Sequence, residues 1–339
     1  MADNYFKRVM AQTPTNFWIN NVTREEAKVA LEAGAVGCTQ NPSYTWKMLS
    51  SESDGDYAKE LLRKILADEP DDTMAEVKLQ RELVAKVAQE YIPLYESSHH
   101  KQGYVSIQGD PFHEDYKTIV ECARYNREAA PNIMAKVPVT PEGLKAIETL
   151  IAEGCPINAT ECMAVRQVLD LCEVYDRVAK EMENPPVVYF SLITGIFDEY
   201  MKKYVEEKKI DISPDVLWQG GFAVAKKVHQ LVAERKYNVG FIGGGARGLH
   251  HFTRWSAQTQ ASPSTGRAQQ TSCLSRTQSL LTDSAHRYRI PSSTSLRRRS
   301  MSSARHTTST QSIRQSTRSM ARSFCSGPAS RMHGEMPST

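Results

Sequence analysis

Short apolar runs alternate with longer helical segments from about residue 16 to residue 252, and this alternation limits the possible folds most strongly. Several runs are apolar at consecutive positions, which is typical of parallel strands covered on both faces. Seven strand–helix repeats predict an α/β fold, a (β/α)8 TIM barrel whose eighth strand is missing or replaced by a disordered tail. The predicted strands are Phe17–Asn20, Gly34–Thr39, Tyr104–Gln108, Ile133–Val137, Pro156–Thr160, Val187–Ser191 and Val239–Gly243.

Helix starts support the same interpretation. Thr23 and Glu26 have the spacing of a capping box, and Thr140 precedes a proline at the first helical position. Apolar residues recur at helical spacing in four longer segments, residues 72–96, 113–128, 161–183 and 214–235. A doubly wound open sheet is the alternative. However, the first predicted strand is not followed by the glycine-rich phosphate turn of such folds.

Polar side chains gather at the carboxyl ends of the predicted strands, which face the active site in a barrel. Singly they have ordinary explanations, because Asn41 before Pro42 can cap a helix and Asp110 before Pro111 can make a turn. The glycine run 243–248 is either a phosphate-binding nest or a plain tight loop. Together these strand ends predict a site for a polar, phosphorylated carbonyl compound. The set is Asn20, Asn41, Gln108, Asp110, Lys136, Asn158, Thr160, Glu161, Ser191 and Arg247.

Lys136 is the residue of this set with the most specific chemistry. It lies in the apolar run Ile133–Val137, and lysine is seldom buried without a reason. An amine that loses hydration has a lowered pKa and can attack a carbonyl, so Lys136 is a candidate Schiff-base nucleophile. The alternative is an edge lysine whose ammonium group faces water.

Five segments carry a resemblance to the transaldolase family of class I aldolases and occur in the order typical of that family. They are Gly34–Ser43, Val105–Pro111, Ile133–Ile147, Glu153–Thr160 and Gly243–Arg247. The resemblance covers roughly residues 14–252 and implies a (β/α)8 barrel that moves a dihydroxyacetone unit between sugar phosphates, without a metal or organic cofactor. It further implies a place in carbohydrate metabolism, in the pentose phosphate pathway.

The resemblance also implies residue roles. Lys136 is implied to form the Schiff base, Asn41, Asn158, Thr160 and Ser191 to contact substrate or the catalytic water, and Arg247 to bind phosphate.

Three strand-end positions depart from the family pattern. Asn20 stands where an acidic proton-transfer residue is usual, Gln108 where Glu is frequent, and Ile196 where an arginine commonly binds phosphate. An amide cannot exchange a proton near neutral pH, so Glu161 is the candidate replacement, unless it is an exposed residue at a helix start. Gln108 also occurs in the fructose-6-phosphate aldolase branch, which makes a lyase the alternative function. A defective barrel that only binds sugar phosphates is the third.

The chain changes composition after Thr253, which divides it into a body of residues 1–253 and a tail of residues 254–339. The tail contains 21 Ser, 11 Thr and 13 Arg but no Lys, and two acids leave it with a charge of +11. The whole chain carries +3, so the body carries −8, which argues against nucleic acid as a partner.

A Ser/Thr/Arg-rich tail of this kind is typical of a disordered linker or a nucleic-acid-binding arm. We interpret it instead as a shifted reading frame. If one nucleotide was lost near Thr253, the neighbouring frame permits segments with strand-like and acidic helix-like composition. A disordered, low-complexity tail without an evolved function is therefore predicted.

The remaining features predict a cytoplasmic protein with a sugar-phosphate substrate and neither nucleic acid nor membrane as partner. Seven cysteines are scattered without CxxC pairs, which is typical of reduced thiols. No run of 18 apolar residues indicates a membrane span, and residues 1–8 lack the pattern of an export signal. The sequence gives no indication of the oligomeric state.

Overall fold

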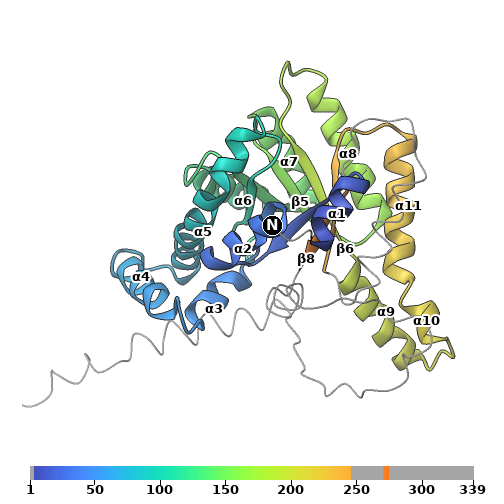
Figure 1. Ribbon diagram of the computed structural model, residues 1–339, viewed down its shortest axis with the longest axis horizontal. Coiled ribbons are helices and arrows are strands. Elements are labelled where there is room, and N and C mark those ends of the chain that lie inside the picture. The colour runs from blue at the N-terminus through green and yellow to red at the C-terminus, as the bar shows by residue number, and fades with distance from the viewer. Residues whose placement is uncertain (1–3, 246–269, 275–339) are drawn as a thin grey trace, which may run out of the picture.

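The computed structural model describes residues 4–245 and 270–274, and these residues form a closed barrel of eight parallel strands in chain order (Figure 1). Each of the seven predicted strands is confirmed, with ends within two residues of the prediction. The (β/α)8 architecture is therefore confirmed. The strands are β1 (Thr15–Asn20), β2 (Ala35–Gln40), β3 (Tyr104–Gln108), β4 (Ile133–Pro138), β5 (Ile157–Cys162), β6 (Val188–Ile193), β7 (Gly240–Gly244) and β8 (Gln270–Leu274).

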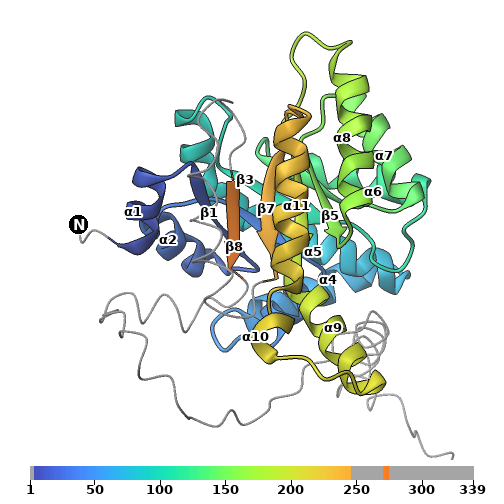
Figure 2. The same ribbon diagram turned by 90° about the vertical axis from the view of Figure 1, so that its right-hand side faces the viewer.

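Helices surround the barrel on the outside (Figures 1 and 2). Those described are α1 (Tyr5–Gln12), α2 (Arg24–Ala33), α3 (Ser43–Leu49), α4 (Gly55–Asp68), α5 (Asp72–Ser97), α6 (Tyr116–Arg127), α7 (Pro141–Ala152), α8 (Val165–Ala179), α9 (Thr194–Lys208), α10 (Pro214–Leu217) and α11 (Gly220–Glu234).

The two predicted helix caps are confirmed. The Thr23 hydroxyl accepts from the backbone N–H of Glu26 while the Glu26 carboxylate accepts from the backbone N–H of Thr23, and Thr140 caps α7. The predicted helix 161–183 begins too early, because β5 continues to Cys162. The predicted helix 214–235 is divided into α10 and α11.

The strands are buried on both faces, as their apolar sequences predict. On β4, Ala135 and Val137 belong to the apolar cluster between barrel and helices, whereas Met134 belongs to the cluster inside the barrel. Because side chains alternate along a strand, Lys136 points to the same inner side as Met134. The strand geometry thus directs the amine toward the barrel interior.

Large rings fill the lower interior of the barrel, and glycines on neighbouring strands make room for them. A Cβ atom on Gly37 would lie 2.8 Å from the Trp18 ring, and one on Gly240 would lie 2.2 Å from the Tyr189 ring. The ring centroids of Trp18 and Tyr189 are 5.2 Å apart. These aromatic residues close the barrel below the polar ends of the strands.

The eighth position of the ring is occupied by β8, which comes from the Ser/Thr/Arg-rich tail. Figure 2 shows β8 between β7 and β1. It pairs in parallel with both neighbours, with Cys273 opposite Trp18 and Thr271 opposite Ile242. Of the two predicted alternatives, a missing eighth strand and its replacement by the tail, the position of residues 270–274 corresponds to the second, because these tail residues pair with the edges of β1 and β7. The predictions of a disordered tail and of a shifted reading frame concern residues 254–339. Of these residues, the structure describes 270–274, and the others lie outside the described ranges.

The described residues bear on two further predictions, which concern membrane spans and cysteine thiols. None of the described helices is both long enough and apolar enough to cross a membrane. Five of the cysteines carry buried thiols rather than disulfides, namely Cys38, Cys122, Cys155, Cys162 and Cys172.

Candidate active site

A cavity of about 570 Å³ opens at the carboxyl ends of the strands, where the sequence predicts the site. Its wall contains seven of the nine catalytic and binding residues predicted from the sequence, together with residues that were not predicted. The candidates on the wall are Asn20, Asn41, Gln108, Lys136, Thr160, Glu161 and Ser191, joined by Asn21, Thr39, Ser43, Glu114 and Ile196 among others.

Lys136 is one of these seven residues, and the strand register places it between two other predicted residues. Its Cα is paired with Gln108 on β3 and with Asn158 on β5. Lys136 is half-buried, whereas the other residues of β4 are buried. The predicted apolar strand around the amine is confirmed, and the side chain itself reaches the cavity rather than a sealed core.

A hydrogen-bonded layer crosses the barrel beside Lys136. The side-chain amide of Asn158 donates to Ser106 Oγ at 3.0 Å, and Ser191 Oγ donates to Asn158 Oδ1 at 2.7 Å. All three residues are buried, and Ser191 reaches the cavity wall while Asn158 is fully buried and is not part of that wall. Asn158 thus fixes the orientation of Ser191. Ser106 was missed by the sequence reasoning, although its alternation with Gln108 on β3 signals an inward position.

Gln108 and Glu161 contact each other across the cavity. The Gln108 side-chain amide donates to Glu161 Oε1 at 3.0 Å. Glu161 has a φ of +61° and lies in β5, where the pairing with β6 shifts register. Its backbone carbonyl accepts from Gln167 Nε2 at 3.1 Å, which holds this turn of the chain. Glu161 is therefore a half-buried cavity residue, not an exposed residue at a helix start.

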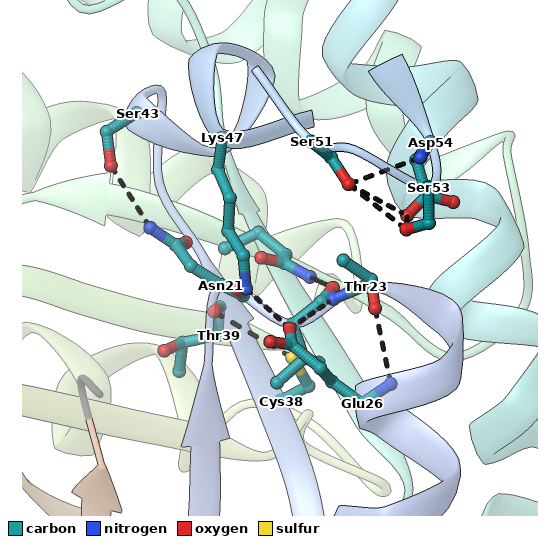
Figure 3. Close-up of polar contacts among 12 residues, drawn as sticks. Asn21, Thr23, Glu26, Cys38, Thr39, Ser43, Lys47, Ser51, Ser53 and Asp54 are labelled. Atoms are coloured by element: carbon teal, nitrogen blue, oxygen red, sulfur yellow. Dashed lines mark hydrogen bonds and ion pairs between the residues drawn. The ribbon is translucent and has the colours of Figure 1, made fainter. Parts of the chain in front are cut away.

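Asparagines at the end of β1 and the start of α3 form a second polar network (Figure 3). Asn21, which sequence reasoning missed, donates to Asn41 Oδ1 at 2.9 Å and to Ser43 Oγ at 3.1 Å. The Asn21 carbonyl accepts from Lys47 Nζ at 2.8 Å, and Lys47 also pairs with Glu26. This network holds Asn41 at the cavity wall.

Asn20 lies on the cavity wall as well, and its orientation is set from β2. The Thr39 hydroxyl donates to Asn20 Oδ1 at 2.8 Å, so the Asn20 amide nitrogen is the remaining polar atom of that side chain. An amide in this position can donate a hydrogen bond to a substrate oxygen but cannot exchange a proton with it.

Glu114 is a cavity residue whose acidity is altered by its surroundings, and sequence reasoning missed it. It lies in the loop between β3 and α6 and is half-buried. Burial first, and then the carboxylates of Glu161 and Asp110, raise the pKa of Glu114 to about 7. Asp110 itself accepts from the backbone N–H of Phe112 at 2.7 Å and pairs with His113 at 2.6 Å.

The phosphate-binding prediction concerns the end of β7. Gly244 and Gly245 line the cavity, so the start of the predicted glycine loop lies at the site. Arg247 lies outside the described residues. Among the residues that are described, no three His, Cys, Asp or Glu side chains are grouped to hold a metal ion.

Comparisons with known proteins agree with this architecture. A sequence model of the family "Transaldolase/Fructose-6-phosphate aldolase" matches residues 17–286. A protein named transaldolase from Thiobacillus denitrificans is 30% identical over 264 residues, which cover 73% of each chain. Another transaldolase, from Saccharopolyspora erythraea, is 28% identical over 186 residues, and the match spans 49% of its length and 52% of this chain.

One further relative is named transaldolase 2, from Nostoc punctiforme, and is 30% identical over 186 residues, 52% of this chain and 48% of its own. Among solved structures, an enolase of the mandelate racemase subgroup from Agrobacterium tumefaciens overlaps 76% of this chain and 54% of its own, at 11% identity and a TM-score of 0.37. The family match extends over most of the barrel, and the chain belongs to the transaldolase/fructose-6-phosphate aldolase family.

Proposed function

We propose that the chain is a transaldolase-like class I aldolase that transfers or cleaves the dihydroxyacetone unit of a ketose phosphate. The observation that supports this most directly is the position of Lys136, an amine on an inner strand position that reaches a large polar cavity. Family membership and relatives named transaldolase point to the same activity. The place of the reaction would be carbohydrate metabolism, in the pentose phosphate pathway.

The chemistry begins with addition of the neutral Lys136 amine to the ketone carbon of the substrate. Loss of water from this adduct gives a protonated imine, which is an electron sink. When the bond between the third and fourth substrate carbons breaks, its electron pair forms an enamine and neutralises the imine nitrogen. The hydroxyl on the fourth carbon loses its proton and becomes the carbonyl of the departing aldehyde.

The surrounding residues suit this sequence of steps. Thr160, Gln108 and Glu161 lie beside one another on the wall and offer a hydroxyl, an amide and a carboxylate to the water that is lost and regained. Ser191, Asn20 and Asn41 offer groups that can bind substrate hydroxyls.

Two residues that are not part of the described cavity wall complete the proposed assignment. Asn158 positions the Ser191 hydroxyl by accepting a hydrogen bond from it. Arg247, which follows the cavity residue Gly245 by two positions in the sequence, is the proposed partner of the substrate phosphate.

Borohydride trapping tests the imine. In the presence of fructose 6-phosphate, reduction is expected to attach the sugar-derived group to Lys136, located by peptide mass spectrometry. Lys136→Arg should abolish labelling and turnover, whereas Lys145→Arg, at an exposed lysine on α7, is the matched control and should leave both unchanged. Absence of labelling in the unaltered chain would refute the proposed function.

A lyase that releases free dihydroxyacetone is the second candidate, and one observation favours it. Gln108 stands on the third strand and its amide is committed to the Glu161 carboxylate. Incubation with fructose 6-phosphate and no acceptor aldehyde separates the two activities. Steady release of dihydroxyacetone identifies the lyase, whereas turnover that requires an added aldose phosphate identifies the transferase.

A further inference from the structure

The proposed reaction requires a group that takes a proton from a substrate hydroxyl and returns one later, and Asn20 cannot do this. Among the described residues of the cavity wall, three side chains can titrate: Lys136, Glu114 and Glu161. Lys136 is occupied by the imine during bond cleavage. The proton-transfer group is therefore to be sought between the two glutamates.

The position of Glu114 connects it with the amine. Glu114 lines the main cavity and also a second, small pocket of about 20 Å³ that lies between β3, β4 and α6. Gln108 and Lys136 line both of these spaces too. The small pocket has room for about one water molecule. Glu114 and Lys136 thus line the same main cavity, in which a substrate hydroxyl can lie within reach of both.

The two glutamates differ in their hydrogen bonding. Glu161 accepts a hydrogen bond from the Gln108 amide at 3.0 Å. Glu114 faces the carboxylates of Glu161 and Asp110, and the charge of Asp110 is held in place by Phe112 and His113. Two negative neighbours favour retention of a proton on Glu114. With its pKa raised to about 7, Glu114 is present in both forms near neutral pH, as a group that both accepts and donates a proton should be.

From this geometry we propose that Glu114 is the general acid/base of the carbon–carbon bond step, with Glu161 as the fixed charge beside it. This assignment rests on the proposed function. In cleavage the ionised Glu114 takes the proton of the hydroxyl on the fourth substrate carbon while that oxygen becomes a carbonyl. In bond formation, protonated Glu114 returns the proton to the new alkoxide as the enamine attacks the acceptor aldehyde.

The test compares Glu114→Gln with the unaltered chain and with Glu121→Gln, a matched control at an exposed position on α6. Turnover of fructose 6-phosphate by Glu114→Gln is expected to fall by about 10²- to 10⁴-fold. The ionisation near pH 7 should disappear from its pH–rate profile. Labelling of Lys136 by borohydride should persist, because the amine that forms the imine is unchanged. Glu121→Gln should match the unaltered chain in rate and profile.

A second variant separates chemistry from folding. Glu114→Ala removes the carboxyl and leaves space at the cavity wall, so added formate should restore part of the lost turnover. Normal turnover and an unchanged pH profile in Glu114→Gln, with Lys136 still labelled, would overturn the Glu114 assignment and leave the proposed function intact. Failure of formate to restore any turnover to a folded Glu114→Ala would also count against the assignment. If the unaltered chain is not labelled at Lys136, the proposed function fails first and this assignment fails with it.

Discussion

Glu76 provides a prediction whose magnitude can be worked from the structure. It lies on α5 and is 6% exposed, and its Oε1 accepts from the Thr45 hydroxyl at 3.1 Å. Within the described residues, its Oε2 has no hydrogen-bond partner. Burial, which outweighs the Thr45 hydrogen bond, and the nearby Asp110 carboxylate raise the pKa of Glu76 from 4.5 to about 8.

The sign of the pH dependence follows from this raised pKa. Below pH 4.5 the carboxyl is protonated in both the folded and the unfolded chain, so it adds no pH dependence. Between 4.5 and about 8 the unfolded chain loses the proton while the folded chain keeps it, and the free energy of unfolding falls as the pH rises. Each pKa unit is worth 1.36 kcal/mol, so the full loss is at most about 5 kcal/mol, reached above pH 8.

Glu76→Gln should remove this dependence because the amide stays neutral at every pH and can still accept from Thr45. Urea unfolding of the variant and the unaltered chain, measured from pH 5 to pH 9, should show the variant gaining about 4 kcal/mol over the unaltered chain by pH 8. Glu82→Gln, at an exposed position on the same helix, is the control and should change little. The reasoning would be refuted if the difference in free energy of unfolding between Glu76→Gln and the unaltered chain stayed constant to within about 1 kcal/mol from pH 5 to pH 9.

Two further predictions concern the interior of the barrel. Asn158→Ala leaves two buried serine hydroxyls without their partner and should lower the free energy of unfolding by about 2–5 kcal/mol in urea; a loss below about 1 kcal/mol would contradict the proposed supporting role. Gly240→Ala places a Cβ 2.2 Å from the Tyr189 ring and should cost about 1–3 kcal/mol or more. On the same strand, Gly244→Ala would place a Cβ 3.0 Å from the end of the Ile193 side chain and at an ordinary 3.6 Å from the Leu192 carbonyl oxygen. Thermal unfolding should therefore show the smaller effect at Gly244, and equal losses would contradict the packing argument.

The sequence predicted the strands well because their apolar runs need no tertiary information. Parallel strands covered on both sides must be apolar at consecutive positions, and helices between them must be amphipathic. The same logic placed polar residues at strand ends, and Asn20, Gln108, Lys136 and Ser191 all reach the cavity. Helix α9 was not predicted, since it has few buried residues and its apolar side chains lie largely exposed.

The eighth strand escaped prediction for a different reason. Residues 270–274 lie in a segment rich in serine, threonine and arginine, without an apolar run to mark a strand. What places them in the barrel is backbone pairing with β1 and β7 on both sides. Hydrogen bonding of this kind depends on the gap left by the other seven strands rather than on the local sequence.

Glu114 was missed because nothing in its local sequence distinguishes it from a loop glutamate ahead of a helix. Its place at the cavity depends on the path of the chain after β3, where Asp110 accepts from the Phe112 backbone and pairs with His113. That turn also holds the Asp110 charge near Glu114, so one local structure both directs the carboxyl and raises its pKa. Replacement of Asp110 by Asn should therefore lower the pKa of Glu114. If Glu114 is the acid/base, the pH–rate profile of that variant should shift to lower pH. Loss of the positive charge of a neighbouring amine would instead raise the pKa of Glu114 and shift the profile to higher pH.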